Sequence, residues 1–232
     1  MIPLRDDVEA QSAPVINVLL IAANIAAFLW MFTMPEAAIT KWCIVPHRFL
    51  TQHSLDQIVT IFTAMFMHAG PAHLIGNMWF LWIFGDNVED RMGHFEYLLF
   101  YLICGLGGSL VHIYVDPAST VPCLGASGAI AGVMGGYLVL FPSAKIRVML
   151  DDFWLWSFRW PAWLVIGEWW VLQYVLGVVI HETSSHIGYF AHLGGFAVGM
   201  VLVMLFAKRE PALTSNVDLA YEKYCRDQDI TN

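Results

Sequence analysis

The chain has 232 residues, of which 58% are hydrophobic and 13% are charged, and its formal net charge is −8 at pH 7. This is more apolar surface than a soluble domain of this length can bury. The composition therefore excludes an ordinary soluble enzyme and predicts a protein of the lipid bilayer. The negative charge is spread over loops and tails and predicts no nucleic-acid partner.

Six apolar segments follow one another along the chain, each close to the ~20 residues that cross about 30 Å of hydrocarbon. Their ranges are 15–34, 58–84, 95–115, 124–141, 161–180 and 188–207. We predict an all-α integral membrane protein with six transmembrane helices. Its parts are a short cytoplasmic segment (1–14), a helical domain (15–207) and a polar cytoplasmic tail (208–232).

The positive charges indicate how these helices are oriented. With a cytoplasmic N-terminus, nine lysine and arginine residues lie on the inner side and only Lys41 and Arg48 on the outer side. This is the bias of the positive-inside rule, and six spans return the C-terminus to the cytoplasm. The first segment lacks a small-residue cleavage site, so we interpret it as a retained span and not as a signal peptide.

The second segment carries two polar side chains in its outer half. His73 and Asn77 are four residues apart in "HAGPAHLIGN", which places them on one helix face. Polar and ionisable groups inside a membrane are costly and therefore mark functional sites.

The fourth segment, "CLGASGAIAGVMGGYLVLFP", is unusually poor in bulky residues in its first half. Ser127 lies 15 residues from Pro142, or ~22 Å at the helical rise, which leaves it about 8 Å below the outer edge of a ~30 Å core. Small residues then form two stripes at a spacing of four. One stripe is Ser127, Ala131 and Gly135, and the other is Gly128, Gly132 and Gly136.

The fifth segment contains one charge, Glu168, for which the sequence offers no partner. Tryptophans surround it, and we interpret them as an interfacial aromatic belt and not as a substrate site. They are Trp154, Trp156, Trp160, Trp163, Trp169 and Trp170.

In the sixth segment, His192 lies 16 residues above Lys208, about 24 Å by the same rise. Its depth therefore matches that of Ser127. Gly195 and Gly199 form a further small-residue pair just below it, and such stripes let helices approach closely in lipid. A stripe of this kind is by itself more often plain helix packing. Together with the matched depths, it predicts that His192 and Ser127 come within hydrogen-bond reach.

These motifs, in this order, resemble those of the rhomboid intramembrane serine proteases. "GASG" (125–128) resembles the family's GxSG motif, and "AHLGGFAVG" (191–199) its AHxxGxxxG motif. "HAGPAHLIGN" (68–77) is similar to its HxxxxHxxxN segment, and "VEDRMG" (88–93) to the ExR loop after its second span. The resemblance covers about 60–207.

The resemblance implies a six-span bundle of the bacterial type in the plasma (inner) membrane. It implies Ser127 as nucleophile and His192 as general base and then acid, without metal or cofactor. It also implies an oxyanion site made by the Ser127 N–H, His73 and Asn77, with Gly125 allowing close approach of the substrate backbone. Transmembrane proteins would be the substrates, and the oligomeric state stays open.

One position departs from the family pattern. Many members carry an aromatic residue four positions after the serine, stacked on the histidine, and this chain has Ala131. Something else must therefore orient His192. No aspartate falls near the proposed site, so we expect a dyad.

The residues disfavour several other kinds of protein. "HETSSH" (181–186) spaces its histidines at i, i+5, which turns them ~140° apart on a helix and disfavours a zinc site. Cys43, Cys104, Cys123 and Cys225 show no zinc spacing. Cys43 and Cys123 would both lie on the outer side and could pair, but we expect them to be unpaired. Ala129 stands where an α/β-hydrolase needs glycine, and the absence of an inverted repeat argues against a transporter.

The alternative that stays open is a catalytically inert rhomboid-like protein that binds transmembrane helices. Such a protein is expected to lack the serine or the histidine, and this chain has both.

Overall fold

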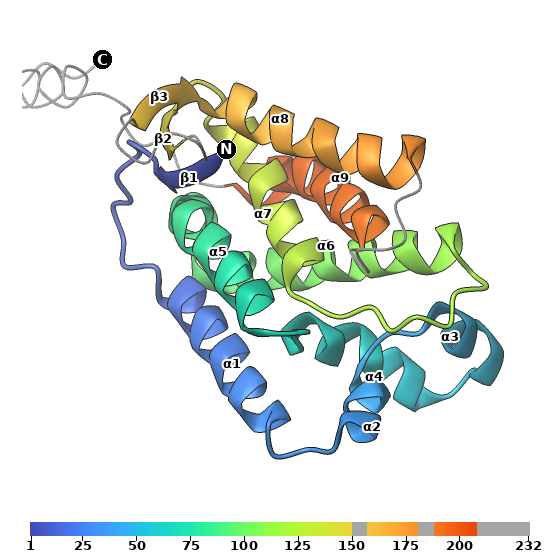
Figure 1. Cartoon of the computed structure of the whole chain (residues 1–232). Coiled ribbons are helices and arrows are strands. Elements are labelled where there is room, and N and C mark those ends of the chain that lie inside the picture. The colour runs from blue at the N-terminus through green and yellow to red at the C-terminus, as the bar shows by residue number, and fades with distance from the viewer. Residues whose placement is uncertain (150–156, 181–187, 208–232) are drawn as a thin grey trace, which may run out of the picture.

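The computed structural model describes residues 1–149, 157–180 and 188–207, which form a helical bundle with a small sheet at one end (Figure 1). Two helical turns, η1 (Thr40–Trp42) and η2 (Ala64–Phe66), and a π-helical segment, η3 (Val175–Val179), accompany the main elements. The helices are α1 (Val15–Met31), α2 (Glu36–Ile39), α3 (Pro46–Gln52), α4 (Leu55–Thr63), α5 (Pro71–Met92), α6 (His94–Val115), α7 (Ser127–Leu140), α8 (Ala162–Tyr174) and α9 (Tyr189–Phe206). The strands are β1 (Ile2–Arg5), β2 (Lys145–Met149) and β3 (Ser157–Pro161).

Three of the described helical segments are long and apolar enough to cross a membrane. They are α6, α8 continued by η3, and α9. The pair formed by Leu55–Phe66 and Pro71–Met92 qualifies as a fourth only when it is taken together. Two further apolar helices, α1 and α7, are shorter. The protein is therefore mostly helical with three to four candidate spans in its described part.

The second predicted segment, 58–84, does not form a single helix. The chain bends by 79° between Phe66 and Pro71. Pro71 occupies the first turn of α5, where its missing N–H costs nothing, and it cannot continue a helix that arrives from before it. The expected loop at 88–93 is also wrong, because α5 continues to Met92.

The α5–α6 turn consists of Gly93, whose φ of 92° lies in the left-handed region that favours glycine. Glu89 lies just before it and is buried. Its two carboxylate oxygens accept hydrogen bonds from the backbone N–H groups of Ile16 and Asn17, at 2.9 and 2.7 Å. A carboxylate at this position satisfies free donors at the N-terminus of α1 and complements the helix dipole.

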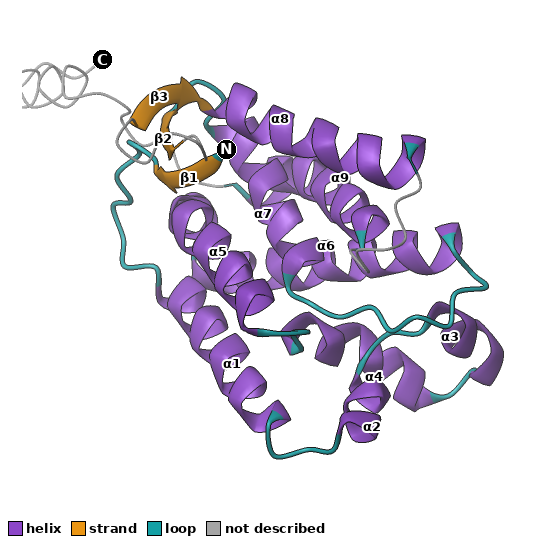
Figure 2. Cartoon of the chain, viewed as in Figure 1, coloured by secondary structure: helices purple, strands orange, loops and turns teal. Residues whose placement is uncertain are grey.

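The expectation of an all-α chain misses a three-stranded antiparallel sheet, ordered β1-β2-β3 (Figure 2). In it, Ile2 pairs with Met149 and Lys145 with Pro161. The N-terminal segment is thus tied to the hairpin that follows α7. The sheet forms because residues 145–149 provide a partner for β1, which no local pattern at residues 2–5 reveals.

Helix α7 lies in the middle of the bundle and packs against α5, α6, α8 and α9 (Figure 1). Glycines account for its closest approach, which is to α9. A methyl group at Gly195 would overlap the carbonyl oxygen of Gly128, and one at Gly199 would overlap that of Gly132. The backbones of the two helices are therefore in direct contact. Gly136 instead faces the ring of Phe100 on α6.

The far end of α7 is held by the N-terminal segment. Asp6 accepts hydrogen bonds from the Tyr137 hydroxyl at 2.5 Å and from Asn87 Nδ2 at 2.8 Å. The pKa of the Asp6 carboxyl is raised to about 7, mainly by burial; the hydrogen bond from Tyr137 opposes this rise, and the nearby carboxylates of Asp86 and Asp7 contribute to it. Asp6 is therefore protonated in the folded protein at mildly acidic pH.

This raised pKa predicts a pH-dependent stability. The unfolded chain releases the Asp6 proton near its ordinary pKa of 3.8, whereas the folded chain keeps it to about 7. The resulting stabilisation is complete below the lower value and is lost as the pH rises through the higher one. We expect the unfolding temperature to fall between about pH 5 and about pH 8 more steeply in wild type than in Asp6→Asn. Thermal unfolding in detergent measures this, with the exposed Glu9→Gln as control; equal slopes for wild type and Asp6→Asn would contradict it.

Candidate active site

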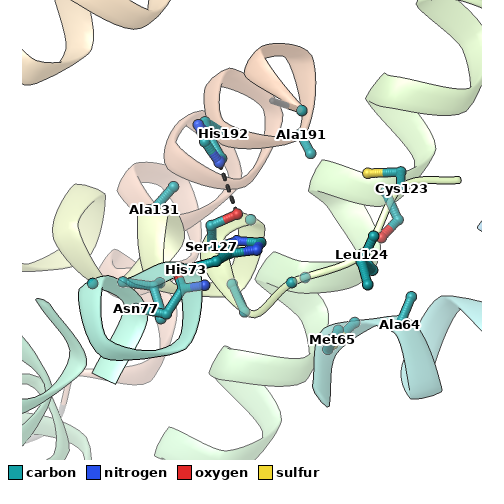
Figure 3. Close-up of a pocket in the computed structure, with 18 of the residues that line it drawn as sticks. Ala64, Met65, His73, Asn77, Cys123, Leu124, Ser127, Ala131, Ala191 and His192 are labelled. Atoms are coloured by element: carbon teal, nitrogen blue, oxygen red, sulfur yellow. Dashed lines mark hydrogen bonds between the residues drawn. The ribbon is translucent and has the colours of Figure 1, made fainter. Parts of the chain in front are cut away.

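The first residue of α7 and the first turn of α9 meet at the wall of a cavity (Figure 3). Ser127 Oγ lies 2.7 Å from Nε2 of His192, which is only 8% exposed. The glycine contacts between α7 and α9 bring the two backbones close enough for the short serine side chain to reach the imidazole. The serine and the histidine thus form a hydrogen-bonded pair of the kind that activates a nucleophile.

Two side chains of α5 lie on the same cavity, one turn apart (Figure 3). His73 Nδ1 accepts a hydrogen bond from the Ala69 N–H at 3.4 Å, which leaves the ring proton on Nε2. The Asn77 Nδ2 group is buried and makes no hydrogen bond to the described residues. Two N–H donors are therefore available beside Ser127.

Gly125 lies between His73 and the serine. Its φ of 130° is rarely adopted by other residues. A side chain there would also meet His73 Nε2 at 2.9 Å and Ser127 Oγ at 3.6 Å. The Gly125 N–H donates to the Ala64 carbonyl at 2.8 Å, which fixes the loop that leads into α7. Glycine is thus required both by the backbone conformation and by the space.

The cavity has a volume of about 530 Å³ and is lined mainly by apolar groups. Its lining includes Ser127, His192, His73, Asn77 and Trp169. A cavity of this size and character can take an extended stretch of peptide or an apolar side chain.

Two residues of α8 at this site were missed by the sequence analysis. Gln173 Oε1 lies 2.8 Å from His192 Nδ1. The ring of Trp169, one turn earlier, lies 5.7 Å from the imidazole between ring centroids. The interpretation of Trp169 as part of an interfacial belt is therefore wrong. The sequence feature that could have revealed these two residues is a glutamine inside an apolar segment, four residues after a tryptophan.

Other predicted features lie elsewhere. Glu168 is exposed on α8, and Cys43, Cys104 and Cys123 are free thiols, as expected. Within the described residues, no group of three His, Cys, Asp or Glu side chains could hold a metal ion. The "HETSSH" stretch, Trp154, Trp156, Cys225 and the tail (208–232) lie outside the described residues.

These features define an integral, multi-pass membrane protein with a serine–histidine pair that faces a cavity. The family model of the Rhomboid domain matches residues 55–209. The chain belongs to the rhomboid family, whose members are generally intramembrane serine proteases.

Curated relatives agree with this assignment. The chain is 34% identical to Rhomboid-like protein 11, chloroplastic, of Arabidopsis thaliana, over 67% of this chain and 55% of the relative. It is 29% identical to Rhomboid protein 1, mitochondrial, of Saccharomyces cerevisiae, over 78% and 50%. It is 28% identical to Rhomboid-type serine protease 2 of Emericella nidulans, over 73% and 31%. The matched region thus spans about half or less of these relatives.

Proposed function

We propose that this protein is an intramembrane serine endopeptidase that cleaves transmembrane or membrane-proximal segments of single-pass membrane proteins. The observation that carries the proposal is the 2.7 Å contact between Ser127 Oγ and His192 Nε2 at the wall of a cavity. A serine hydroxyl is a weak nucleophile until a neighbouring base takes its proton, and His192 supplies that base. A relative named as a serine protease supports the same chemistry.

The reaction follows from this geometry. Ser127 Oγ attacks the scissile carbonyl carbon while His192 Nε2 takes the hydroxyl proton. The protonated imidazole then gives that proton to the leaving amine as the C–N bond breaks. A water molecule, deprotonated by the same nitrogen, hydrolyses the acyl-enzyme and restores the Ser127 hydroxyl.

The negative charge that develops on the carbonyl oxygen needs donors that are already in position. The Ser127 N–H belongs to the first turn of α7, where backbone donors have no intrahelical partner. The unpaired Asn77 Nδ2 and the Nε2–H of His73 supply the other donors. Gly125 leaves the oxyanion position open to them.

Asn77→Ala is expected to lower the rate of substrate cleavage by about 10²–10³-fold, as loss of one oxyanion donor does in a soluble protease. The donor acts in the transition state, so kcat should fall far more than KM rises. Steady-state cleavage of a reconstituted transmembrane substrate measures both constants. A change confined to KM would remove Asn77 from the oxyanion site.

The arrangement in the membrane is part of the proposal. The six spans are α1, α5, α6, α7, α8 with η3, and α9, with both termini on the cytoplasmic side of the plasma (inner) membrane. Helix α7 has 14 residues, or ~21 Å, so Ser127 is recessed in a core of about 30 Å. A substrate helix must therefore unwind locally to present its carbonyl.

The test is labelling of the detergent-solubilised wild-type protein with a fluorophosphonate, a probe that phosphonylates activated serines. Labelling and cleavage are expected, and both should persist after addition of a chelator. Loss of activity with the chelator would favour a metal site at 181–186. An unlabelled wild type would favour the inert transmembrane-helix binder, the second candidate function.

A further inference from the structure

The imidazole of His192 makes hydrogen-bond contacts through both ring nitrogens. Nε2 faces Ser127 Oγ at 2.7 Å, and Nδ1 faces Gln173 Oε1 at 2.8 Å. Gln173 and His192 are each 8% exposed, so both residues are buried. The second contact comes from α8, a helix that carries neither the nucleophile nor the proposed oxyanion donors.

The identity of the facing atoms decides which nitrogen holds the ring proton. An amide oxygen can only accept, so the Nδ1 that it faces must donate its proton. A neutral imidazole then has a free lone pair on Nε2, and this is the form that can take the proton of Ser127. The opposite tautomer would carry its proton on Nε2 and could not act as the base.

A second contact to the imidazole ring also comes from α8. Trp169 lies one turn before Gln173, with its ring 5.7 Å from the imidazole and inclined to it by 36°. Ala131 of α7, where many rhomboid proteases carry an aromatic residue, is fully buried but too small to take that role. In this chain the contacts to the histidine ring other than that of Ser127 therefore include two from α8.

The buried environment of His192 favours an uncharged hydrogen-bond acceptor beside Nδ1. The titratable side chains that act electrostatically on His192 are His73 of α5 and His112 of α6. A carboxylate beside Nδ1 would add a costly buried charge inside the membrane. An amide supplies the hydrogen-bond acceptor without that charge.

We propose that Gln173 is the positioning residue of the dyad: it fixes the tautomer and ring orientation of His192, so that α8 completes the active site. This inference rests on the proposed serine protease function. It makes Gln173 the third member of a Ser–His–Gln arrangement in which the glutamine touches only the histidine.

The experiment compares fluorophosphonate labelling rates of wild type, Gln173→Met, Gln173→Glu and the control Val171→Met, which is exposed on α8. Methionine keeps the length of the side chain but removes the acceptor. We expect Gln173→Met to label about 10- to 100-fold more slowly at neutral pH, because the imidazole loses its partner. Its unfolding temperature should match that of the control.

Gln173→Glu tests the role of Gln173 through the pH dependence of the labelling rate, which a purely structural residue would not change. The carboxylate keeps a hydrogen-bond acceptor beside Nδ1, so at alkaline pH the labelling rate of Gln173→Glu should be closer to that of wild type than to that of Gln173→Met. A carboxylate also stabilises the protonated imidazole, so the acidic limb of the pH–rate profile should move to higher pH than in wild type.

The outcomes separate the two proposals. If wild type labels and Gln173→Met labels as fast as Val171→Met, Gln173 is not a positioning residue although the protease stands. A Gln173→Glu profile that coincides with that of wild type also overturns the inference. An unlabelled wild type overturns the protease function and the role of Gln173 with it.

Discussion

Ser127→Ala is expected to lower cleavage of a transmembrane substrate by about 10⁴-fold or more and to abolish fluorophosphonate labelling, because loss of the nucleophile removes the covalent route. His192→Ala should cost a similar factor, since nucleophile and base act as a unit. In both variants the substrate should still bind, because the cavity keeps its apolar lining. Cleavage assays in proteoliposomes and gel-based labelling measure the two effects.

The matched control for this experiment is Ser109→Ala. Ser109 is a buried serine of α6 that also lines the cavity, so it tests whether any serine on this wall reacts. It should retain wild-type labelling. If Ser127→Ala is labelled as strongly as Ser109→Ala, another residue is the nucleophile.

Gly195→Ala is expected to reduce labelling by about 10²-fold or more, the cost of displacing a catalytic group by roughly 1 Å. The added methyl group would overlap the Gly128 carbonyl oxygen, and because the obstacle is backbone, α7 and α9 must move apart. That movement lengthens the 2.7 Å contact between Ser127 and His192. The unfolding temperature should fall as well.

Gly167→Ala is the control for this prediction. Gly167 lies within α8, and a methyl group there meets nothing within 4 Å. The substitution should leave labelling unchanged and keep or raise stability, since alanine is favoured over glycine in helices by about 1 kcal/mol. If Gly195→Ala behaves like Gly167→Ala, close packing of α7 and α9 is not what holds the pair together.

The contact between Ser127 and His192 could be predicted from the sequence because it depends on two quantities that can be read from the sequence. One is depth, counted in residues from the polar end of each segment. The other is the small-residue spacing that allows close approach. The catalytic roles of the two residues stay predictions until the variants are measured.

The contacts that Gln173 and Trp169 of α8 make with His192 could not be predicted in the same way. Whether Trp169 faces lipid or the imidazole depends on the rotation of α8 about its axis, and the nearly uniform apolar pattern of that segment does not fix the rotation. Pairing of β1 with β2 depends on residues more than 130 positions apart. The break before Pro71, in contrast, had a local signal in the Gly-Pro pair of "HAGPAH".

The attachment of Asp6 to Tyr137 has a practical consequence for handling the protein. Helix α7 begins at the serine, and its far end is fastened by the first residues of the chain through β1 and Asp6. The N-terminal strand lies beside the end of α7 that is opposite Ser127 (Figure 1). Removing residues 2–7 would break both attachments, so we expect it to loosen the helix that begins at Ser127 and to lower the rate of the proposed cleavage.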